Sequence, residues 1–462
     1  MRVFYLKGIS MKTIKTFLFV TLFTSSIFSQ IDNDKIDSII KSSLTENKGY
    51  NWLKELCNIG PRLSGSENSL KAIKWAETKM KSIGFDSVWL QKVFVPHWER
   101  GKIEKAFVSN SKKYLNKYFK VTALGGSVAT PINGITGKII EVKSVEEVAK
   151  LNNAKGKIIF YNRPFDNSLV NTMEAYGKAV DQRSIGAIEA AKVGAIGVIV
   201  RSIQSNYDNN PHTGSMRYDE TINKIPAVAI SVIDADFLSK AIKDDENLEV
   251  TLILDCKKFD DALSYNVIGE IKGSEFPNEI IVAGGHFDSW DKGCGAHDDG
   301  GGCIQSIEAV ELFKRLNIKP KRTLRTVLFI NEENGLKGGI EYSKLAQSLT
   351  EKHLAAIESD RGVHSPRGFY VTTDSITFNK LQNFLPYLNK TKIDWIKFGG
   401  SGADVGQLKN AKALFGYVPD DQRYMDYHHS DNDTLDKVNP REMELGTASI
   451  SILMYLLSEN GL

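Results

Sequence analysis

The sequence of 462 residues has little cysteine, almost no excess of charge and, beyond its N-terminus, no apolar run long enough to span a membrane. Its four cysteines, Cys57, Cys256, Cys294 and Cys303, are too few for a disulfide framework, and none are spaced as a CxxC zinc motif. The sequence leaves two alternatives for these cysteines: free thiols, or a disulfide bridge that involves Cys294 or Cys303. We therefore expect an ordinary globular protein of two or three domains.

The charge balance is nearly neutral once the N-terminus is set aside. The first 29 residues hold four of the 59 basic residues and no acidic one, so the rest of the chain has 55 basic against 56 acidic residues, a net of −1. A chain with this balance gives no electrostatic reason to expect nucleic acid as a partner.

Residues 1–29 have the pattern of a secretory signal. Lys12 and Lys15 precede a short apolar run at residues 17–23, and small or polar residues follow. Cleavage after Ser29 is expected, with Ser26 as an alternative. A retained anchor is the other interpretation, but the run is shorter than the roughly 20 residues that a membrane span needs. The pattern predicts an exported protein, periplasmic or extracellular, with no membrane attachment after cleavage.

The middle of the chain, residues 118–260, differs from its flanks. Short apolar strands are predicted there, with few and short helices between them, at residues 137–142, 157–161, 196–200, 227–230 and 248–254. No cluster of Asp, Glu and His occurs in this region. We expect a separate non-catalytic module here, and one domain made of residues 30–117 and 261–462.

From residue 262 onward, longer strands alternate with longer helices. Strands are predicted at residues 279–284, 323–330, 354–357 and 413–418, and helices at residues 301–316, 335–348 and 443–457. Alternation of this kind predicts an α/β fold with a mostly parallel sheet flanked by helices.

Acidic and histidine side chains follow the predicted strands of this last region. They occur at five places: His286 with Asp288, His297 with Asp298 and Asp299, Glu332 with Glu333, Asp360, and His428 with His429. Ligands in open α/β sheets bind beyond the carboxyl ends of the strands, so we expect these side chains to converge at one edge of the sheet.

Convergence of so many acids predicts a bound cation, because the carboxylates would otherwise repel one another. Nitrogen and oxygen ligands without thiolate favour zinc, with cobalt or manganese as alternatives. Six side chains suit two metals that share a carboxylate. His286 and Asp288 alternate along an extended segment, so Asp288 can hold the second ring nitrogen of His286. Glu332 and Glu333 diverge, so one can bind metal while the other acts as a base.

These motifs resemble the co-catalytic di-zinc aminopeptidases and glutamate carboxypeptidases. The resemblance lies in residues 285–291, 295–302, 332–333, 358–360 and 428–434, and residues 60–66 are similar to the N-terminal motif of that superfamily. It implies the di-zinc exopeptidase fold. Residues 190–200 are similar to the core of a protease-associated domain, which implies that the middle module is an α/β insertion that covers the site.

The resemblance also implies a role for each candidate residue. Two zinc ions per chain would be held by one pair of ligands each and by one shared carboxylate: His286 and Asp360, Glu333 and His429, and Asp298 between the ions. Glu332 would be the general base, with Asp288 as a supporting catalytic residue. His429 is chosen over His428 because three residues separate it from the Asp433–Thr434 pair.

The implied activity is exopeptidase hydrolysis of dipeptides and short peptides with free ends, by a water shared between the metals. Residues 398–404 resemble a loop that lines the substrate. A true carboxypeptidase is the first alternative; it would need a basic side chain for the substrate carboxylate, and Arg361 and Arg423 are candidates. A non-catalytic binding protein on the same scaffold is the second. The sequence is compatible with a homodimer.

Overall fold

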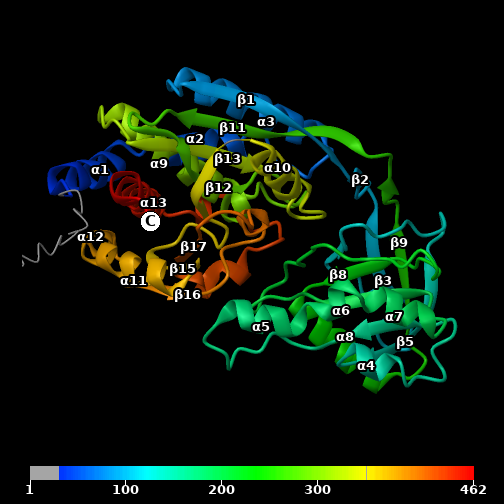
Figure 1. Cartoon of the computed structure of the whole chain (residues 1–462). Coiled ribbons are helices and arrows are strands. Elements are labelled where there is room, and N and C mark those ends of the chain that lie inside the picture. Colours follow the sequence, from blue (N-terminus) through cyan, green and yellow to red (C-terminus); the bar gives the residue numbers. More distant parts are fainter. Residues whose placement is uncertain (1–30, 350) are drawn as a thin grey trace, which may run out of the picture.

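The computed structural model describes residues 31–349 and 351–462, so the predicted signal at residues 1–29 lies outside the described residues. The chain forms two lobes (Figure 1), a larger one built on an eight-stranded sheet and a smaller one built on a seven-stranded sheet. Among the described residues, no helix has the length and apolar character that crossing a bilayer requires.

The sheet of the larger lobe is mixed, with a parallel centre. Its strands, in spatial order, are β1 (Ser87–Val95), β11 (Ala262–Ile271), β13 (Arg322–Phe329), β12 (Phe276–His286), β14 (Lys352–Glu358), β17 (Ala413–Pro419), β15 (Pro366–Thr372) and β16 (Trp395–Phe398). The run from β13 to β17 is parallel. The edge pair β15–β16 is also parallel, whereas the pairs β1–β11, β11–β13 and β17–β15 are antiparallel, so the expected mostly parallel sheet is a mixed one whose parallel pairs lie at the centre and at the β16 edge.

Helices cover both faces of this sheet, as the continuous burial of residues 280–286 in β12 requires. Ile281 and Ala283 belong to the core beneath α1 (Asn33–Glu46), α2 (Lys48–Cys57), α3 (Glu67–Ser82), α9 (Gly301–Arg315) and α13 (Pro440–Asn460). Ile280 and Val282 point to the other face, where they share a core with α10 (Lys337–Ser348). A strand buried on both faces in this way is typical of the parallel centre of an α/β sheet. Helices α11 (Ser375–Leu381) and α12 (Leu385–Leu388) lie near the β16 edge.

The smaller lobe is an insertion, or excursion of the chain, between two paired strands of the larger sheet. The chain leaves the sheet after Val95 and returns at Ala262, and these two residues are direct partners in the β1–β11 pair. A short ribbon of β2 (Trp98–Glu99) and β10 (Lys257–Lys258) joins the two lobes. The excursion therefore spans residues 96–261, so the boundary expected at residue 118 is too late. Pairing between strands so distant in sequence leaves no local signal.

The sheet of the smaller lobe has its own helices. Its strands, in order, are β3 (Glu104–Asn110), β9 (Glu249–Leu254), β5 (Ile135–Val142), β6 (Ile158–Tyr161), β7 (Gly197–Arg201), β8 (Ala227–Ile230) and β4 (Val121–Ala123). The helices are α4 (Val145–Val148), α5 (Thr172–Ala179), α6 (Asp181–Ser184), α7 (Gly186–Lys192) and α8 (Val232–Asp244). Strands β5 to β8 pair in parallel, and β3, β9 and β4 are antiparallel to their neighbours.

Two contacts fix the smaller lobe to the segment that follows β12. The indole of Trp290 packs into the core of the smaller lobe, where it occupies the space that a side chain at position 125 would need, so Gly125 allows this close approach. Next to it, the Arg100 guanidinium donates to both carboxylate oxygens of Asp291, at 2.6 and 2.9 Å. The segment that joins β12 to the site is thus held from both lobes.

A buried pair of carboxyl groups lies between α9 and α13. Glu308 and Glu444 are fully buried, both side chains lie next to Gly49, and Arg315 donates to Glu308 at 2.8 Å. Burial raises the pKa of Glu308 well above its usual value, and the neighbouring Glu444 raises it further. The folded chain therefore binds more protons than the unfolded chain above about pH 4.5, so this pair makes the protein less stable as the pH rises.

We predict that Glu308→Gln stabilises the protein at pH 8 by about 1 kcal/mol and changes its stability much less at pH 5, because the amide donates to Glu444 without taking up a proton. Urea unfolding of parent and variant at both pH values tests this. Glu311→Gln is the matched control, since Glu311 lies one turn away and contacts the same Arg315. An equal shift at both pH values would contradict the prediction.

Candidate metal centre and active site

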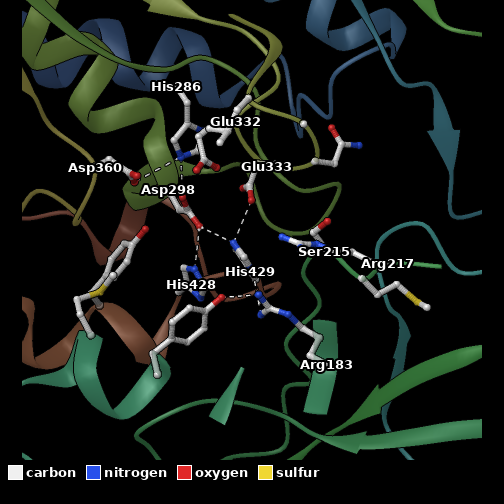
Figure 2. A pocket seen from close by; sticks show the side chains of 17 residues that line it. Arg183, Ser215, Arg217, His286, Asp298, Glu332, Glu333, Asp360, His428 and His429 are labelled. Atoms are coloured by element: carbon white, nitrogen blue, oxygen red, sulfur yellow. Dashed lines mark hydrogen bonds and ion pairs between the residues drawn. The ribbon is translucent and has the colours of Figure 1, made fainter. Parts of the chain in front are cut away.

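The candidate residues meet at the carboxyl ends of the parallel strands. His286 is the last residue of β12, while Glu332 and Glu333 follow β13 and Asp360 follows β14. Asp298 comes from the segment before α9, and His429 from the loop after β17. All six line one cavity of about 530 Å³ between the two lobes (Figure 2).

Asp298 lies at the centre of this group, with one carboxylate oxygen toward each histidine. Its Oδ1 is 3.1 Å from Nε2 of His286, and its Oδ2 is 3.3 Å from Nε2 of His429. On the outer sides, Asp360 Oδ1 is 3.4 Å from His286 Nε2, and Glu333 Oε2 is 3.0 Å from His429 Nε2. The arrangement is two histidine–carboxylate pairs joined by one carboxylate.

These separations suit tetrahedral zinc. Ligand atoms about 2.0–2.2 Å from a zinc ion in tetrahedral geometry are roughly 3.3–3.5 Å apart. The four nitrogen–oxygen distances around Asp298 fall at or slightly below that range. Two buried oxygens, Oδ2 of Asp298 and Oε1 of Glu333, make no hydrogen bond to any described residue, so both are available to a cation. The donor set therefore fits zinc on each side of Asp298.

The electrostatics of the cavity also favour a cation. The pKa of Glu332 is raised to about 8, chiefly by burial and also by the charges of Asp360, Asp288 and Asp298, while His286 acts to lower it. Burial likewise raises the pKa of Glu333 well above its usual value, with Asp298 adding to the rise. Carboxylates that repel one another in a buried cavity become compatible when a divalent ion binds among them.

Glu332 and Glu333 diverge as the sequence predicts. Glu333 points toward His429, whereas the Glu332 side chain forms no ion pair with the described residues and lies at the cavity wall (Figure 2). The two neighbours are therefore placed differently, one against a candidate metal ligand and one against the open space of the cavity.

Asp288 does not hold His286 in the expected way. Nδ1 of His286 is 3.0 Å from the main-chain carbonyl of Asp288, not from its carboxylate. The carboxylate turns instead to the loop after β13, where it accepts hydrogen bonds from the amides of Asn331 and Glu332, at 2.7 and 3.1 Å. Asp288 thus positions Glu332 by binding its backbone amide. The expectation failed because β12 ends at His286, so the side chains of residues 286 and 288 no longer alternate as they would along a strand.

Two neighbours of the candidate ligands have other contacts. The Asp299 carboxylate accepts from the amides of His286 and Gly302, at 3.0 and 3.2 Å, so it fixes the backbone around the site. His428 stacks on His429 with ring centroids 3.5 Å apart, and its Nε2 is 3.8 Å from Asp298. His428 also lines the cavity, so it lies close enough to contact a bound ligand.

Several residues that shape the site gave little signal in the sequence. Buried Arg62 donates to the carbonyls of Phe287, Cys294 and Gly295, and Asp433 accepts from the amide of Asp298 at 3.0 Å. Both belong to matched motifs, which was the only sign of a role. The smaller lobe also contributes cavity-lining residues that no motif marked: Met173, Tyr176, Arg183, Ser215, Met216 and Arg217.

The two arginines and the loop that the sequence suggested for substrate binding do not line the cavity. The guanidinium of Arg361 stacks on Tyr370, 5.4 Å from the ring centroid, and Arg423 donates to His364 at 3.2 Å. Residues 398–404 do not line the cavity, although the Ala403 amide donates to Glu358. All four cysteines are free thiols, and Cys303 donates to the carbonyl of His286.

A mixed α/β sheet with histidines and carboxylates gathered at its carboxyl edge is typical of metallohydrolases, and similarity to known proteins specifies the class. The sequence pattern of peptidase family M28 matches residues 266–451. Carboxypeptidase Q of Bos taurus is 35% identical over 417 residues, which cover 90% of this chain and 86% of that protein.

Solved structures support the same family assignment. The peptidase M28 precursor of Shewanella amazonensis superimposes with a TM-score of 0.88 at 34% identity, covering 92% of this chain and 96% of that one. A zinc aminopeptidase of Bacillus subtilis, at 21% identity and with 89% and 95% covered, has a TM-score of 0.63 and shows the same fold. The chain is a metallo-exopeptidase. It belongs to peptidase family M28, which implies zinc as its metal.

We predict that Asp298→Ala lowers the zinc content more than Asp360→Ala does, because Asp298 contacts both histidines and Asp360 only one. Elemental analysis after dialysis against zinc checks this. Asp299→Asn is the matched control, since it keeps the size of the side chain and can still accept from one of the two amides, and it should keep the zinc content of the parent. Full zinc content in Asp298→Ala together with loss in Asp299→Asn would assign the central position to Asp299.

Proposed function

We propose that this chain is a di-zinc exopeptidase that hydrolyses dipeptides and short peptides with free ends. The observation that supports it is the position of Asp298, whose two oxygens face His286 and His429 at 3.1 and 3.3 Å. A single carboxylate between two histidine–carboxylate pairs is the arrangement that two metals sharing one ligand require.

His286 and Asp360 would hold one ion, Glu333 and His429 the other, and Asp298 both. Two bound zinc ions would supply an activated water and polarise the scissile carbonyl. Glu332 lies in the cavity without an ion-pair partner among the described residues, so its carboxylate is free to take the proton of the attacking water and deliver it to the leaving nitrogen. Asp288 supports this role, since it fixes the amide of Glu332 at 3.1 Å.

The smaller lobe, residues 96–261, is proposed to be an inserted protease-associated domain that restricts the substrate. It supplies six of the residues that line the cavity, and Arg100 and Trp290 hold it against the catalytic lobe. A cavity of about 530 Å³ with walls from both lobes has room for a short peptide and excludes a folded protein.

Export is proposed as well, on the pattern of residues 1–29 alone. Zinc-site carboxylates and histidines do not depend on reduced thiols, and the four cysteines are not ligands, so an oxidising compartment is compatible with the site.

We predict that Glu332→Gln lowers kcat by about 10²–10⁴ while the zinc content stays that of the parent, because the amide keeps the size of the side chain and cannot accept the proton. Glu333→Gln, the matched control one residue away, should instead lose zinc. Steady-state kinetics with elemental analysis on both variants test this. The two roles are exchanged if Glu332→Gln loses metal and Glu333→Gln loses only turnover.

A further inference from the structure

Two of the four free thiols, those of Cys57 and Cys294, belong to one region of the larger lobe. Cys57 is the last residue of α2 and is partly exposed, whereas Cys294 is buried in the segment between β12 and Asp298. Both pack in the same apolar core. The other two thiols lie elsewhere, Cys256 in the core of the smaller lobe and Cys303 within α9.

One face of α2 brings Cys57 to the segment that contains Cys294. Leu53 and Cys57 are four residues apart in this helix, so their side chains lie on the same face. A side chain at position 300 would meet the Leu53 side chain at 3.2 Å, which places that face against Gly300. The Gly300 amide donates to the carbonyl of Gly295 at 2.9 Å, so the chain folds back at this point and Gly300 lies close to the residue after Cys294.

The chain that follows Cys57 also returns to Cys294. The Gly60 amide donates to the carbonyl of Cys57 at 3.0 Å and turns the chain at the end of α2. Two residues later, the guanidinium of Arg62 donates to the carbonyl of Cys294. On the other side, the Cys294 amide donates to the carbonyl of Asp433 at 2.8 Å. The main chain of Cys294 is therefore fixed at both its amide and its carbonyl, with Cys57 only five residues from one of the groups that fix it.

The two thiols also change each other's acidity. The Cys57 thiol lowers the pKa of Cys294 to about 7, and the Cys294 thiol, together with burial, raises the pKa of Cys57 above its usual value. Opposite shifts of this kind arise when two thiols share one proton, so the pair loses its first proton near neutral pH. A thiolate beside a second thiol is the form that reacts in thiol–disulfide exchange.

We propose that Cys57 and Cys294 form a disulfide bond, made by exchange with an external disulfide, that fastens the end of α2 to the segment leading to Asp298. The proposed export would bring the chain into an oxidising compartment, where such a bond persists. The inference does not depend on the proposed peptidase function.

The exchange needs one external disulfide, RSSR, and begins at the more exposed thiol. The shared proton passes to Cys294 as the Cys57 sulfur attacks RSSR, whose S–S bond breaks; the released thiolate takes up the proton that the pair had lost to solvent. Cys294 then attacks the Cys57 sulfur of the mixed disulfide, and its proton leaves with the second RSH. Two protein thiols are thereby oxidised by two electrons to one disulfide, and RSSR is reduced to two RSH.

The test uses the purified full chain, first reduced and then incubated with oxidised glutathione. Thiol titration of the denatured protein should fall from four thiols to two, and peptide mapping without reductant should find a cross-linked pair that contains Cys57 and Cys294. Cys294→Ser should form no cross-linked pair and should stop at a glutathione adduct on Cys57. Cys256→Ser is the matched control and should form the cross-link as the parent does.

Thermal unfolding tests the fastening. The oxidised parent should unfold at a temperature about 4–8 °C above that of the reduced parent, because the bond closes a long loop of the unfolded chain. Cys57→Ser should show no such difference, and Cys256→Ser should keep it.

Four titratable thiols after oxidation, or a cross-link between Cys294 and Cys303, would overturn the assignment of the bond. A Cys57–Cys294 cross-link that leaves the unfolding temperature unchanged would overturn its fastening role. The peptide map of the parent needs no substitution, so it decides the question even if a serine variant fails to fold. No activity is measured, so failure here leaves the proposed function as it stands.

Discussion

The structure depends on keeping one carboxylate, that of Asp298, buried between His286 and His429. A charged group in that position is costly unless its backbone is fixed and its oxygens are used. Asp433 accepts from the Asp298 amide, Asp299 accepts from the His286 amide, and Arg62 holds the carbonyls of the loop between them. The side chains of Asp433, Asp299 and Arg62 thus hydrogen-bond to main-chain groups. The histidine nitrogens and the outer carboxylates are left available for metal.

This constraint explains why the parallel strands form the centre of a mixed sheet. Strands β13, β12, β14 and β17 run in one direction, so their carboxyl ends bring residues separated by about 140 positions to one edge. The antiparallel strands lie outside that centre and contribute no candidate ligand. Strand β11 instead pairs with β1, the strand after which the chain leaves for the smaller lobe, so the edge of the sheet serves to join the lobes.

The sequence predicted the parts of the fold that local patterns encode. The apolar runs of β12, β13 and β17, the helical spacing of α9 and α13, and the acids and histidines that follow strands all lie where expected. Contacts between residues that are distant in the sequence could not be predicted. The partnership of Val95 with Ala262 set the lobe boundary, and the turn of Asp288 away from His286 followed from the end of β12. Arg217 lies in a region without motifs, and only the packing of the two lobes brings it to the cavity.

That packing makes the smaller lobe part of the site. Thr213 and Gly214 touch His429, a candidate metal ligand, and Trp290, which follows β12, inserts its ring into the core of the smaller lobe. A displacement of the smaller lobe would therefore disturb both the wall that faces the substrate and the loops that hold the histidines. The cavity wall and the candidate metal ligands are consequently held by the same few contacts, although the candidate ligands all come from the larger lobe.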